Sequence, residues 1–342
     1  MSSARDGYVP NRRKLDQEAG ELHRLLLLPL QQQLAGRRQL FVSPDGSLQL
    51  VPFEVLRSPE GAYLVESVQI SYVAAGRDIL RFERKDSASG RAPEAVILSD
   101  PNYDLGLKAP DPGLVHVTAS PSRGAFLSSF SRLPDTRLEA DAIEAILKQR
   151  MRIAVRSFQG DQAVEAALTS VESPKILHLA THGYFLGQDE TAPSPGGVET
   201  GQATLKDDPM FRSGLALAGV NYSLRAGTDG GVVSAEKLMG LRLGRTDLVV
   251  LSACETGVGE VLSGEGVFGL KRAFILSGAR AVVLSLWSVP SAETRELMTT
   301  FYNLMADGKS KAEALRQAKL EMAKEKPNPF YWGAFVLIGN PQ

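Results

Sequence analysis

Short apolar runs alternate with amphipathic segments over most of the chain after residue 92. The apolar runs are rich in β-branched and aliphatic residues, which is typical of strands buried on both faces. They lie at residues 95–98, 152–155, 175–180, 247–251, 279–286 and 335–338. The segments between them have helical character and lie at residues 136–150, 161–171, 266–276, 292–306 and 310–324. This alternation predicts an α/β fold, in which helices cover a mostly parallel sheet.

The first 90 residues have a mixed pattern. It predicts a helix at 17–34 that is interrupted near Pro29, then strands at 40–43, 48–51 and 68–73, with a turn at Pro44-Asp45-Gly46. Residues 84–92, Arg-Lys-Asp-Ser-Ala-Ser-Gly-Arg-Ala, have the composition of a linker. We therefore expect a smaller N-terminal α+β portion, residues 1–90, and a larger α/β domain, residues 91–342.

A long polar segment interrupts the second domain. Residues 186–214 are rich in Gly, Pro, Thr and Asp and include Ala192-Pro193-Ser194-Pro195-Gly196-Gly197. A connection of this length is either functional, such as a lid over a cleft, or has no fixed structure. The pattern favours neither alternative.

Charge and hydropathy exclude several classes of partner. The 342 residues have a formal net charge of −1 and no long run of like charge, so we expect neither nucleic acid nor an anionic membrane as a direct partner. The longest leucine run, Leu25 to Leu28, is far shorter than the ~20 apolar residues of a membrane helix, and the N-terminus has no apolar stretch of a secretory signal. The sequence thus predicts a soluble, cytoplasmic protein.

Cys254 is the only cysteine, so no internal disulfide can form, which suits a reducing compartment. It follows the predicted strand at 247–251 after two small residues, and His182 follows the strand at 175–180 after one residue, Thr181. Catalytic and ligand-binding residues of open α/β sheets lie at the carboxyl ends of strands. If the two strands are neighbours, the imidazole and the thiol face each other.

A cysteine and a histidine at this place are sufficient for peptide hydrolysis. The imidazole assists deprotonation of the thiol, the thiolate attacks a carbonyl carbon, and the imidazolium protonates the leaving amine. The N–H groups of Gly183 and Cys254 are candidates for the oxyanion hole. The alternative is that Cys254 is a small packing residue and His182 merely ends a strand.

Two further patterns predict neither a cofactor nor a metal. Gly264-Glu265-Gly266-Val267-Phe268-Gly269 matches G-x-G-x-x-G, but it does not directly follow a strand, so we interpret its glycines as packing residues. His178 and His182 are four residues apart, but Leu179 occupies the glutamate position of the zinc-binding motif. His178 is better explained as a buried strand histidine that orients its neighbours.

Two segments resemble the catalytic motifs of the CHAT domain, a relative of separase, caspases and gingipains. These segments are His178-Leu179-Ala180-Thr181-His182-Gly183-Tyr184-Phe185 and Leu251-Ser252-Ala253-Cys254-Glu255-Thr256-Gly257. Further segments match in order, among them Ser99-Asp100-Pro101-Asn102-Tyr103, Ser213-Gly214-Leu215-Ala216-Leu217-Ala218-Gly219, Ser285-Leu286-Trp287-Ser288-Val289 and Tyr331-Trp332-Gly333-Ala334-Phe335. The resemblance extends from about Leu22 to Gly339.

This resemblance implies a caspase-like three-layer α/β sandwich, preceded by a smaller pseudo-protease-like portion. It implies His182 as base and Cys254 as nucleophile of a cysteine endopeptidase that cleaves a protein substrate. CHAT domains often follow tetratricopeptide repeats that sense a partner, so an activating sensor or regulatory protein is expected. Some members activate bacterial defence effectors such as gasdermin-like pore formers, and the same role is a hypothesis by analogy here.

The substrate pocket departs from that of the relatives. Separase has an aspartate after the Leu-Trp of the next strand, where this chain has Ser291. Metacaspases have an aspartate at the second position before the nucleophile, where this chain has Ser252. We therefore expect a neutral residue before the scissile bond, unless Glu293, Asp207 or Asp208 supplies a charge. Two alternatives remain: a catalytically silent scaffold or interaction module, and a thiol hydrolase of small amides.

Overall fold

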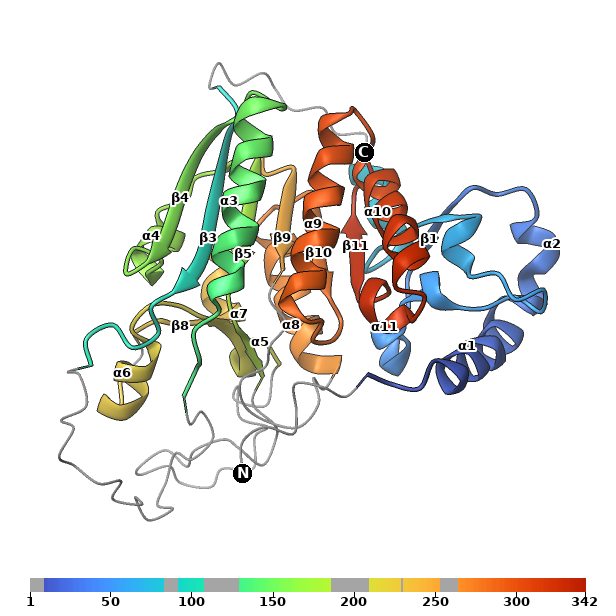
Figure 1. Cartoon of the computed structure of the whole chain (residues 1–342), viewed down its shortest axis with the longest axis horizontal. Coiled ribbons are helices and arrows are strands. Elements are labelled where there is room, and N and C mark those ends of the chain that lie inside the picture. Colours follow the sequence, from blue (N-terminus) through green and yellow to red (C-terminus); the bar gives the residue numbers. More distant parts are fainter. Residues whose placement is uncertain (1–8, 83–91, 108–128, 186–208, 229, 253–263) are drawn as a thin grey trace, which may run out of the picture.

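The computed structural model describes residues 9–82, 92–107, 129–185, 209–228, 230–252 and 264–342. Its main feature is a sheet of eight strands (Figure 1). Their order in space is β1 (Gln39–Val42), β2 (Gln69–Tyr72), β11 (Phe335–Gly339), β10 (Ala281–Ser285), β9 (Leu248–Leu251), β5 (Ile176–Ala180), β3 (Glu94–Pro101) and β4 (Ala154–Gly160). All neighbours pair in parallel except β10 with β11. The predicted mostly parallel sheet is confirmed.

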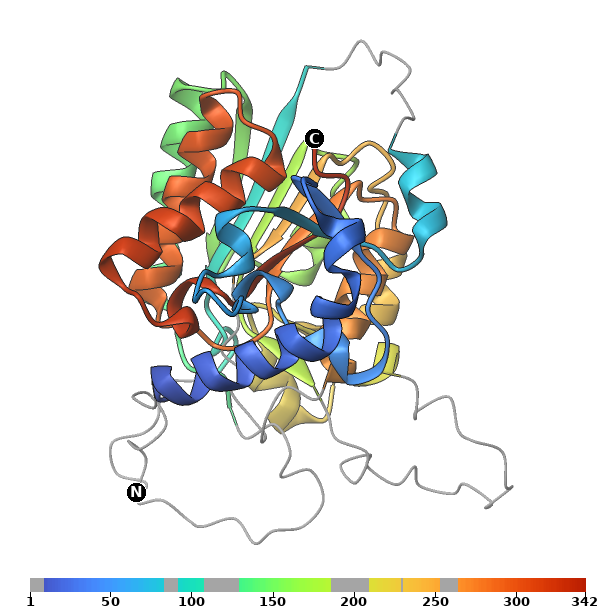
Figure 2. The ribbon, with the colours of Figure 1, turned by 90° about the vertical axis from the view of Figure 1, so that its right-hand side faces the viewer.

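Helices cover both faces of this sheet. One face packs against α3 (Pro134–Gln149), α9 (Ser291–Ala306), α10 (Lys311–Glu325) and α11 (Pro329–Trp332). The other packs against α4 (Glu165–Thr169), α5 (Pro209–Arg212), α7 (Ala235–Met239) and α8 (Gly264–Leu276). Figure 2 shows these layers edge-on, with α3, α9 and α10 on one side of the strands and α8 on the other. The inner strands β3, β5, β9, β10 and β11 are buried on both faces, which explains their almost continuous apolar sequences, whereas the edge strands β1 and β4 are only partly buried.

A small second sheet follows His182. It consists of β6 (Gly183–Phe185), β7 (Ser213–Ala216) and β8 (Val232–Ser234), all antiparallel, and α6 (Val220–Ala226) lies between β7 and β8. The sequence pattern did not predict these short strands, because three or four residues are too few to show a period. Of the predicted polar segment 186–214, residues 186–208 lie outside the described residues, and the rest forms α5 and the start of β7.

The N-terminal portion contains α1 (Arg12–Leu26), α2 (Gln31–Leu34), β1, β2 and the 3-10 turns η1 (Leu28–Leu30), η2 (Gly46–Leu50), η3 (Phe53–Val55), η4 (Leu64–Glu66) and η5 (Gly76–Arg81). The strand predicted at 48–51 is wrong, because η2 takes its place. Asp45 caps this turn by accepting from the backbone N–H of Gly46 at 2.8 Å. The partner of β1 is the parallel strand β2, which needs a crossover rather than a hairpin.

Strands of the N-terminal portion extend the main sheet, since Tyr72 of β2 pairs with Ile338 of β11. A buried polar cluster lies beside this contact. Lys319 on α10 donates to Oε1 of Glu54 at 2.8 Å, and the Tyr72 hydroxyl donates to Oε2 at 2.6 Å. The Tyr72 oxygen in turn accepts from the backbone N–H of Phe53 at 2.7 Å. The predicted linker, residues 84–92, lies outside the described residues except for Ala92.

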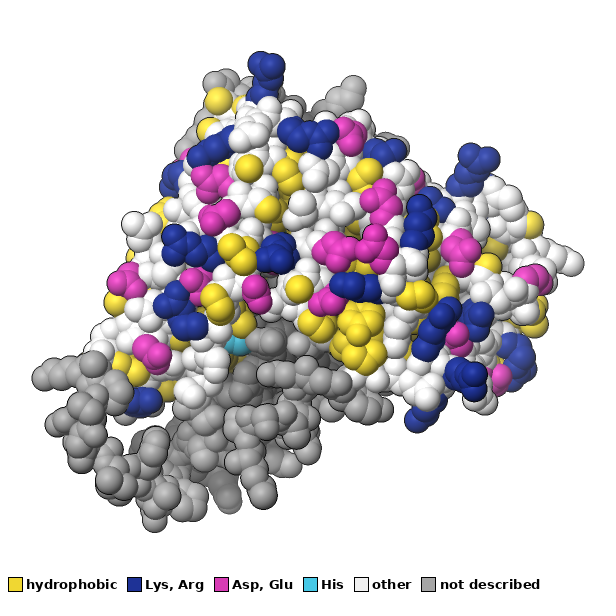
Figure 3. All heavy atoms as spheres, in the orientation of Figure 1, with side chains coloured by type: hydrophobic (Ala, Val, Ile, Leu, Met, Phe, Trp, Pro, Cys, Tyr) yellow, Lys and Arg dark blue, Asp and Glu magenta, His cyan; other side chains and the backbone are white. Residues whose placement is uncertain are grey.

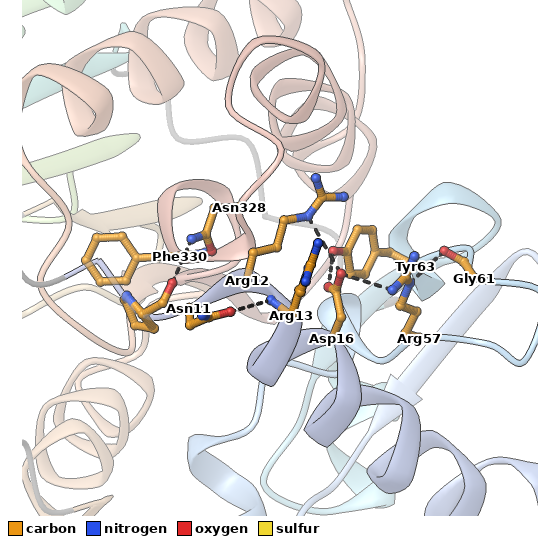
Figure 4. Close-up of polar contacts among 10 residues, drawn as sticks. Asn11, Arg12, Arg13, Asp16, Arg57, Gly61, Tyr63, Asn328 and Phe330 are labelled. Carbon is orange, nitrogen blue, oxygen red and sulfur yellow. Dashed lines mark hydrogen bonds and ion pairs between the residues drawn. The ribbon is translucent and has the colours of Figure 1, made fainter.

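Polar contacts also hold α1 in place (Figure 4). Asp16 accepts a hydrogen bond from the Tyr63 hydroxyl at 2.5 Å and forms an ion pair with Arg57 at 2.9 Å. The carbonyl of Pro10 accepts from the side-chain amide of Asn328 at 2.9 Å. These contacts join the start of α1 both to the rest of the N-terminal portion and to the C-terminal residues.

The surface carries mixed charge. On the face shown in Figure 3, basic and acidic side chains are interspersed, and neither sign gathers into one large patch. No helix in the described part of the chain is both long and apolar enough to cross a bilayer.

Candidate active site

Strands β5 and β9, which lead to the two predicted catalytic positions, are neighbours in the sheet. They pair in parallel from Ile176 opposite Leu248 to Leu179 opposite Leu251. The pairing continues past β9, because the backbone N–H of Ser252 donates to the carbonyl of Leu179 at 3.1 Å. The carboxyl ends of both strands therefore lie side by side, at the edge where parallel sheets bind ligands.

His182 lies just beyond the end of β5 and is 2% exposed. Its ring lies against Tyr103 and Phe130, with ring centroids 5.2 and 5.5 Å away. Its Nε2 is 2.8 Å from the carbonyl oxygen of Ser131. Because a carbonyl only accepts hydrogen bonds, Nε2 carries the proton in this contact, and Nδ1 is then the basic nitrogen of the neutral ring.

Hydroxyl groups fix the backbone on either side of this histidine. Thr181 donates to the carbonyl of Ala216, so Tyr103 is the donor in its 3.0 Å contact with the Thr181 oxygen. The Tyr103 oxygen accepts from the backbone N–H of His182 at 3.2 Å. Burial raises the pKa of Tyr103, so this hydroxyl keeps its proton to more alkaline pH than an exposed tyrosine does. The carbonyl of His182 accepts from Ala216 N at 2.9 Å, so the histidine backbone is held at both ends.

Cys254 lies outside the described residues, together with the rest of 253–263. The described residue before this gap is Ser252, which is 5% exposed at the end of β9. Only Ala253 lies between Ser252 and Cys254 in the sequence, so β9 leads directly to the predicted nucleophile.

Gly183 begins β6 and is half-buried. A Cβ atom at this position would lie 3.7 Å from the side chain of Leu270 and 3.8 Å from the carbonyl of Gly214. These are ordinary contact distances, so packing among the described residues does not require glycine. The predicted role of Gly183 as an oxyanion donor stays a prediction.

The two residues of the predicted substrate pocket flank different elements: Ser252 directly follows β9, and Ser291 begins α9. The Ser252 hydroxyl is buried and has no hydrogen-bond partner among the described residues. Ser291 is the first residue of α9 and is half-buried. Glu293 binds Lys326, whose Nζ lies 2.7 Å from its carboxylate. Asp207 and Asp208 lie outside the described residues.

His178 is a fully buried strand histidine, as predicted. Its Nδ1 forms a hydrogen bond of 3.2 Å with the Tyr302 hydroxyl on α9. Its Nε2 lies 3.1 Å from a carboxylate oxygen of Glu139 on α3, but the geometry of this second contact is not that of a hydrogen bond. It therefore contacts the helices on one face of the sheet, whereas His182 contacts Ser131. Within the described ranges, no three His, Cys, Asp or Glu side chains are grouped as metal ligands.

The structure adds residues that sequence reasoning missed, notably Phe130 and Ser131. They lie on the connection between β3 and α3, whose earlier residues, 108–128, are outside the described part. Tyr103 belongs to a segment that resembles the family, but nothing in the sequence indicated its contact with His182. Every residue type has a backbone carbonyl, so the identity of residue 131 did not indicate its contact with His182.

Comparisons with known proteins match nearly the whole chain. The family model of the CHAT domain matches residues 16–340. Tetratricopeptide repeat protein 28 of Mus musculus is 26% identical over 351 residues, which cover 93% of this chain and 13% of that protein. The Homo sapiens protein of the same name is 26% identical over 347 residues, with the same shares. The chain thus spans only a small part of the curated relatives it matches.

Solved structures of cysteine proteinases share the fold. The Arg-specific cysteine proteinase gingipain R has a TM-score of 0.53 and 9% identity, covering 97% of this chain and 68% of that chain. The complex of Porphyromonas gingivalis RgpB pro- and mature domains has a TM-score of 0.51 and 9% identity, covering 97% and 69%. At this identity the likeness concerns the fold alone. The predicted caspase-like α/β sandwich is confirmed.

Proposed function

The chain belongs to the CHAT domain family, and from that membership we propose that it is a cysteine endopeptidase, with His182 as general base and Cys254 as nucleophile. The observation that supports this most is the parallel pairing of β5 with β9. It brings together the two strand ends that lead to residues 182 and 254. In the register of that pairing, Leu179 is opposite Leu251, and residues 182 and 254 each follow these positions by three residues in the sequence.

The contact with Ser131 gives His182 the protonation pattern that this reaction needs. Nδ1 takes the proton of the Cys254 thiol, and the thiolate attacks the carbonyl carbon of the scissile peptide bond. The Ser131 carbonyl stabilises the imidazolium through a charge-assisted hydrogen bond from Nε2. The backbone N–H groups of Gly183 and Cys254 donate to the oxyanion that forms.

Collapse of the tetrahedral intermediate breaks the C–N bond, and the departing amine takes the proton from the imidazolium. The product is a thioester between Cys254 and the acyl part of the substrate. Water then loses a proton to His182 and attacks the thioester carbon, and the proton returns to the departing thiolate. The cycle releases a carboxylic acid and restores the neutral thiol and imidazole.

We propose a protein as substrate, with Ser252 and Ser291 in the pocket for the residue before the scissile bond. The narrower proposal, by analogy with the family, is a defence effector such as a gasdermin-like pore former. The proposed partner is an activating sensor or regulatory protein, and the curated relatives are named for tetratricopeptide repeats. We place the activity in the cytoplasm, because a single nucleophilic cysteine must stay reduced.

Two experiments test this function. The first compares the rate at which iodoacetamide modifies Cys254 at pH 6–7 in the unmodified chain and in His182→Ala; assisted deprotonation predicts a much faster rate in the former. The second adds each of these proteins and Cys254→Ala to a proteome and labels the new N-termini. A cleavage site that depends on both residues identifies the substrate.

Other outcomes favour the alternatives. Equal, slow alkylation of both proteins, with no new N-termini, would indicate a catalytically silent scaffold or interaction module. Alkylation that depends on His182, without cleavage of any protein but with hydrolysis of small amides, would indicate a thiol hydrolase of small molecules.

A further inference from the structure

The chain segment that contacts His182 is held on both sides of the contact. The carbonyl of Ser131 accepts from the imidazole, and each of the neighbouring residues, Phe130 and Arg132, has a polar partner of its own. Side-chain exposure at Arg132 is 46%, so this segment runs along the surface, where backbone is ordinarily mobile. A fixed carbonyl at this place therefore needs a specific cause.

On the N-terminal side, the cause is Asn221 of α6. Its Oδ1 accepts from the backbone N–H of Phe130 at 2.8 Å, and its Nδ2 donates to the carbonyl of Phe130 at 3.0 Å. Asn221 is 3% exposed and is itself fixed, because Nδ2 also donates to Asp104 at 2.7 Å and its backbone N–H donates to the carbonyl of Tyr103 at 2.9 Å. One amide thus holds both polar groups of residue 130.

On the C-terminal side, the cause is Asp100 at the end of β3. Its two carboxylate oxygens accept from Nε and Nη2 of Arg132 at 2.9 and 2.6 Å, which makes the pair bidentate. Asp100 is 3% exposed, and its φ of 45° is in the left-handed region, which Asp and Asn tolerate better than most residues. Its backbone N–H donates to the Thr136 hydroxyl at 2.9 Å, which ties it to the first turn of α3.

We propose that Asp100 and Asn221 are positioning residues of the active site, which hold the Ser131 carbonyl against Nε2 of His182 by fixing the residues on either side of it. This inference rests on the proposed function of His182 as base. A displaced carbonyl leaves the imidazole free to adopt the other tautomer, with the proton on Nδ1, where it cannot accept the thiol proton. It also removes an acceptor that stabilises the imidazolium.

The test variant is Asp100→Asn, because asparagine keeps the size of the side chain and its tolerance of positive φ while it loses the carboxylate. A second variant, Arg132→Gln, breaks the same pair from its half-exposed side. The matched control is Glu94→Gln, which breaks the ion pair of Glu94 with Arg156, 2.7 Å, at the opposite end of β3. The melting temperature of each variant shows that it is folded.

Two readouts distinguish positioning from a purely structural role. The first is the rate of iodoacetamide modification of Cys254 at pH 6–7, which we expect to fall about tenfold in both Asp100→Asn and Arg132→Gln and to stay unchanged in Glu94→Gln. The second is the ¹⁵N chemical shifts of the His182 ring in a Cys254→Ala background. These should change from a proton on Nε2 toward a mixture of tautomers when Asp100→Asn is added.

The opposite charges of Asp100 and Arg132 separate positioning from a simple field effect. A field effect would change the imidazolium population in opposite directions in the two variants, and that result would overturn the inference. Asp104, Asp161 and Asp135 in the first turn of α3 are further charged groups near this segment, and neither variant alters them. The inference would also be overturned if neither variant changed the alkylation rate of Cys254 or the tautomer of His182. The proposed function would still stand in that case, provided that alkylation depended on His182. If alkylation of the unmodified chain equals that of His182→Ala, the proposed function itself fails, and the inference with it.

Discussion

The Nε2 atom of His182 lies 2.8 Å from the carbonyl oxygen of Ser131, although the two residues are 51 positions apart in the sequence. This contact assigns the ring proton to Nε2 and the basic role to Nδ1. It links the end of β5 to the segment that enters α3, so the chemistry proposed for the histidine depends on the path of a distant part of the chain.

The first prediction concerns the two proposed catalytic residues. We expect His182→Ala and Cys254→Ala each to reduce peptide cleavage by at least about 10³-fold while circular dichroism and melting temperature stay close to those of the unmodified chain. Because the two act as a unit, the double variant should be scarcely slower than either single variant. Cleavage that persists in Cys254→Ala, in a preparation free of other proteases, would contradict the mechanism.

The second prediction concerns Gly183. A methyl group at this position meets only ordinary contacts, 3.7 Å to Leu270 and 3.8 Å to Gly214, so Gly183→Ala should change the free energy of unfolding by less than about 1 kcal/mol. It should nevertheless lower kcat/KM, because the methyl group lies beside the proposed oxyanion donor. Gly244→Ala, at an open position of the surface, serves as the control. Full activity in Gly183→Ala would exclude close approach of substrate here.

The third prediction concerns the residue before the scissile bond. Ser252 and Ser291 carry no charge, and Glu293 is already bound to Lys326 at 2.7 Å, so no described carboxylate of this set is available to pair with an arginine. Binding an unpaired guanidinium would cost on the order of 2 to 5 kcal/mol. Competing peptides that differ only in Arg, Leu or Ala at this position should therefore be cleaved with preference for the neutral residues. A strong preference for Arg that disappears in Glu293→Gln would show that the pocket lies elsewhere.

The fourth prediction concerns the buried pair that joins the N-terminal portion to α10. The side chains of Lys319 and Glu54 are 1% and 5% exposed, so Lys319→Met leaves a buried carboxylate without its cation and should lower the free energy of unfolding by about 3 to 5 kcal/mol. The double variant with Glu54→Gln should recover part of this loss. Urea unfolding measures the stability of both variants. The control is Arg242→Gln, which breaks an exposed pair with Glu172 and should change the free energy of unfolding by less than about 1 kcal/mol.

The pair of Lys319 with Glu54 also joins the two predicted domains. We infer from it that residues 91–342 alone are less stable than the whole chain.

The fifth prediction concerns alkaline pH. Burial raises the pKa of Tyr72, Tyr103 and Tyr302, so the folded chain keeps these protons above about pH 10, where the unfolded chain loses them. The unfolded state then binds fewer protons than the folded state. The contribution of these phenols to the free energy of unfolding is fully present below about pH 10. Above that pH, each phenol lowers the free energy of unfolding by about 1.4 kcal/mol per pH unit. Unfolding between pH 8 and 11 should show a shallower decline for Tyr302→Phe than for Tyr222→Phe, in which the lost hydroxyl belongs to an exposed ring. Equal slopes would show that Tyr302 is not responsible.

The sequence by itself determined the strands of the central sheet and the place of His182 at the end of one of them. Strands such as Ile176–Ala180 and Leu248–Leu251 are buried on both faces, and this burial is recorded directly as a run of apolar residues. Motif resemblance likewise identified the family, because its motifs are short and continuous in sequence. Both features involve residues that are adjacent in the sequence, so both can be recognised from the sequence without a structure.

Only the tertiary structure decided which groups meet. The turn at Gly46–Leu50 reads as a strand by composition, yet Asp45 caps it and the partner of β1 comes from Gln69–Tyr72 instead. The adjacency of β5 and β9 follows from crossovers that no pattern fixes. Ser131 reaches His182 through its backbone oxygen, which every residue type possesses. Contacts of this kind depend on the path of the chain rather than on side-chain chemistry, so the sequence alone contains no sign of them.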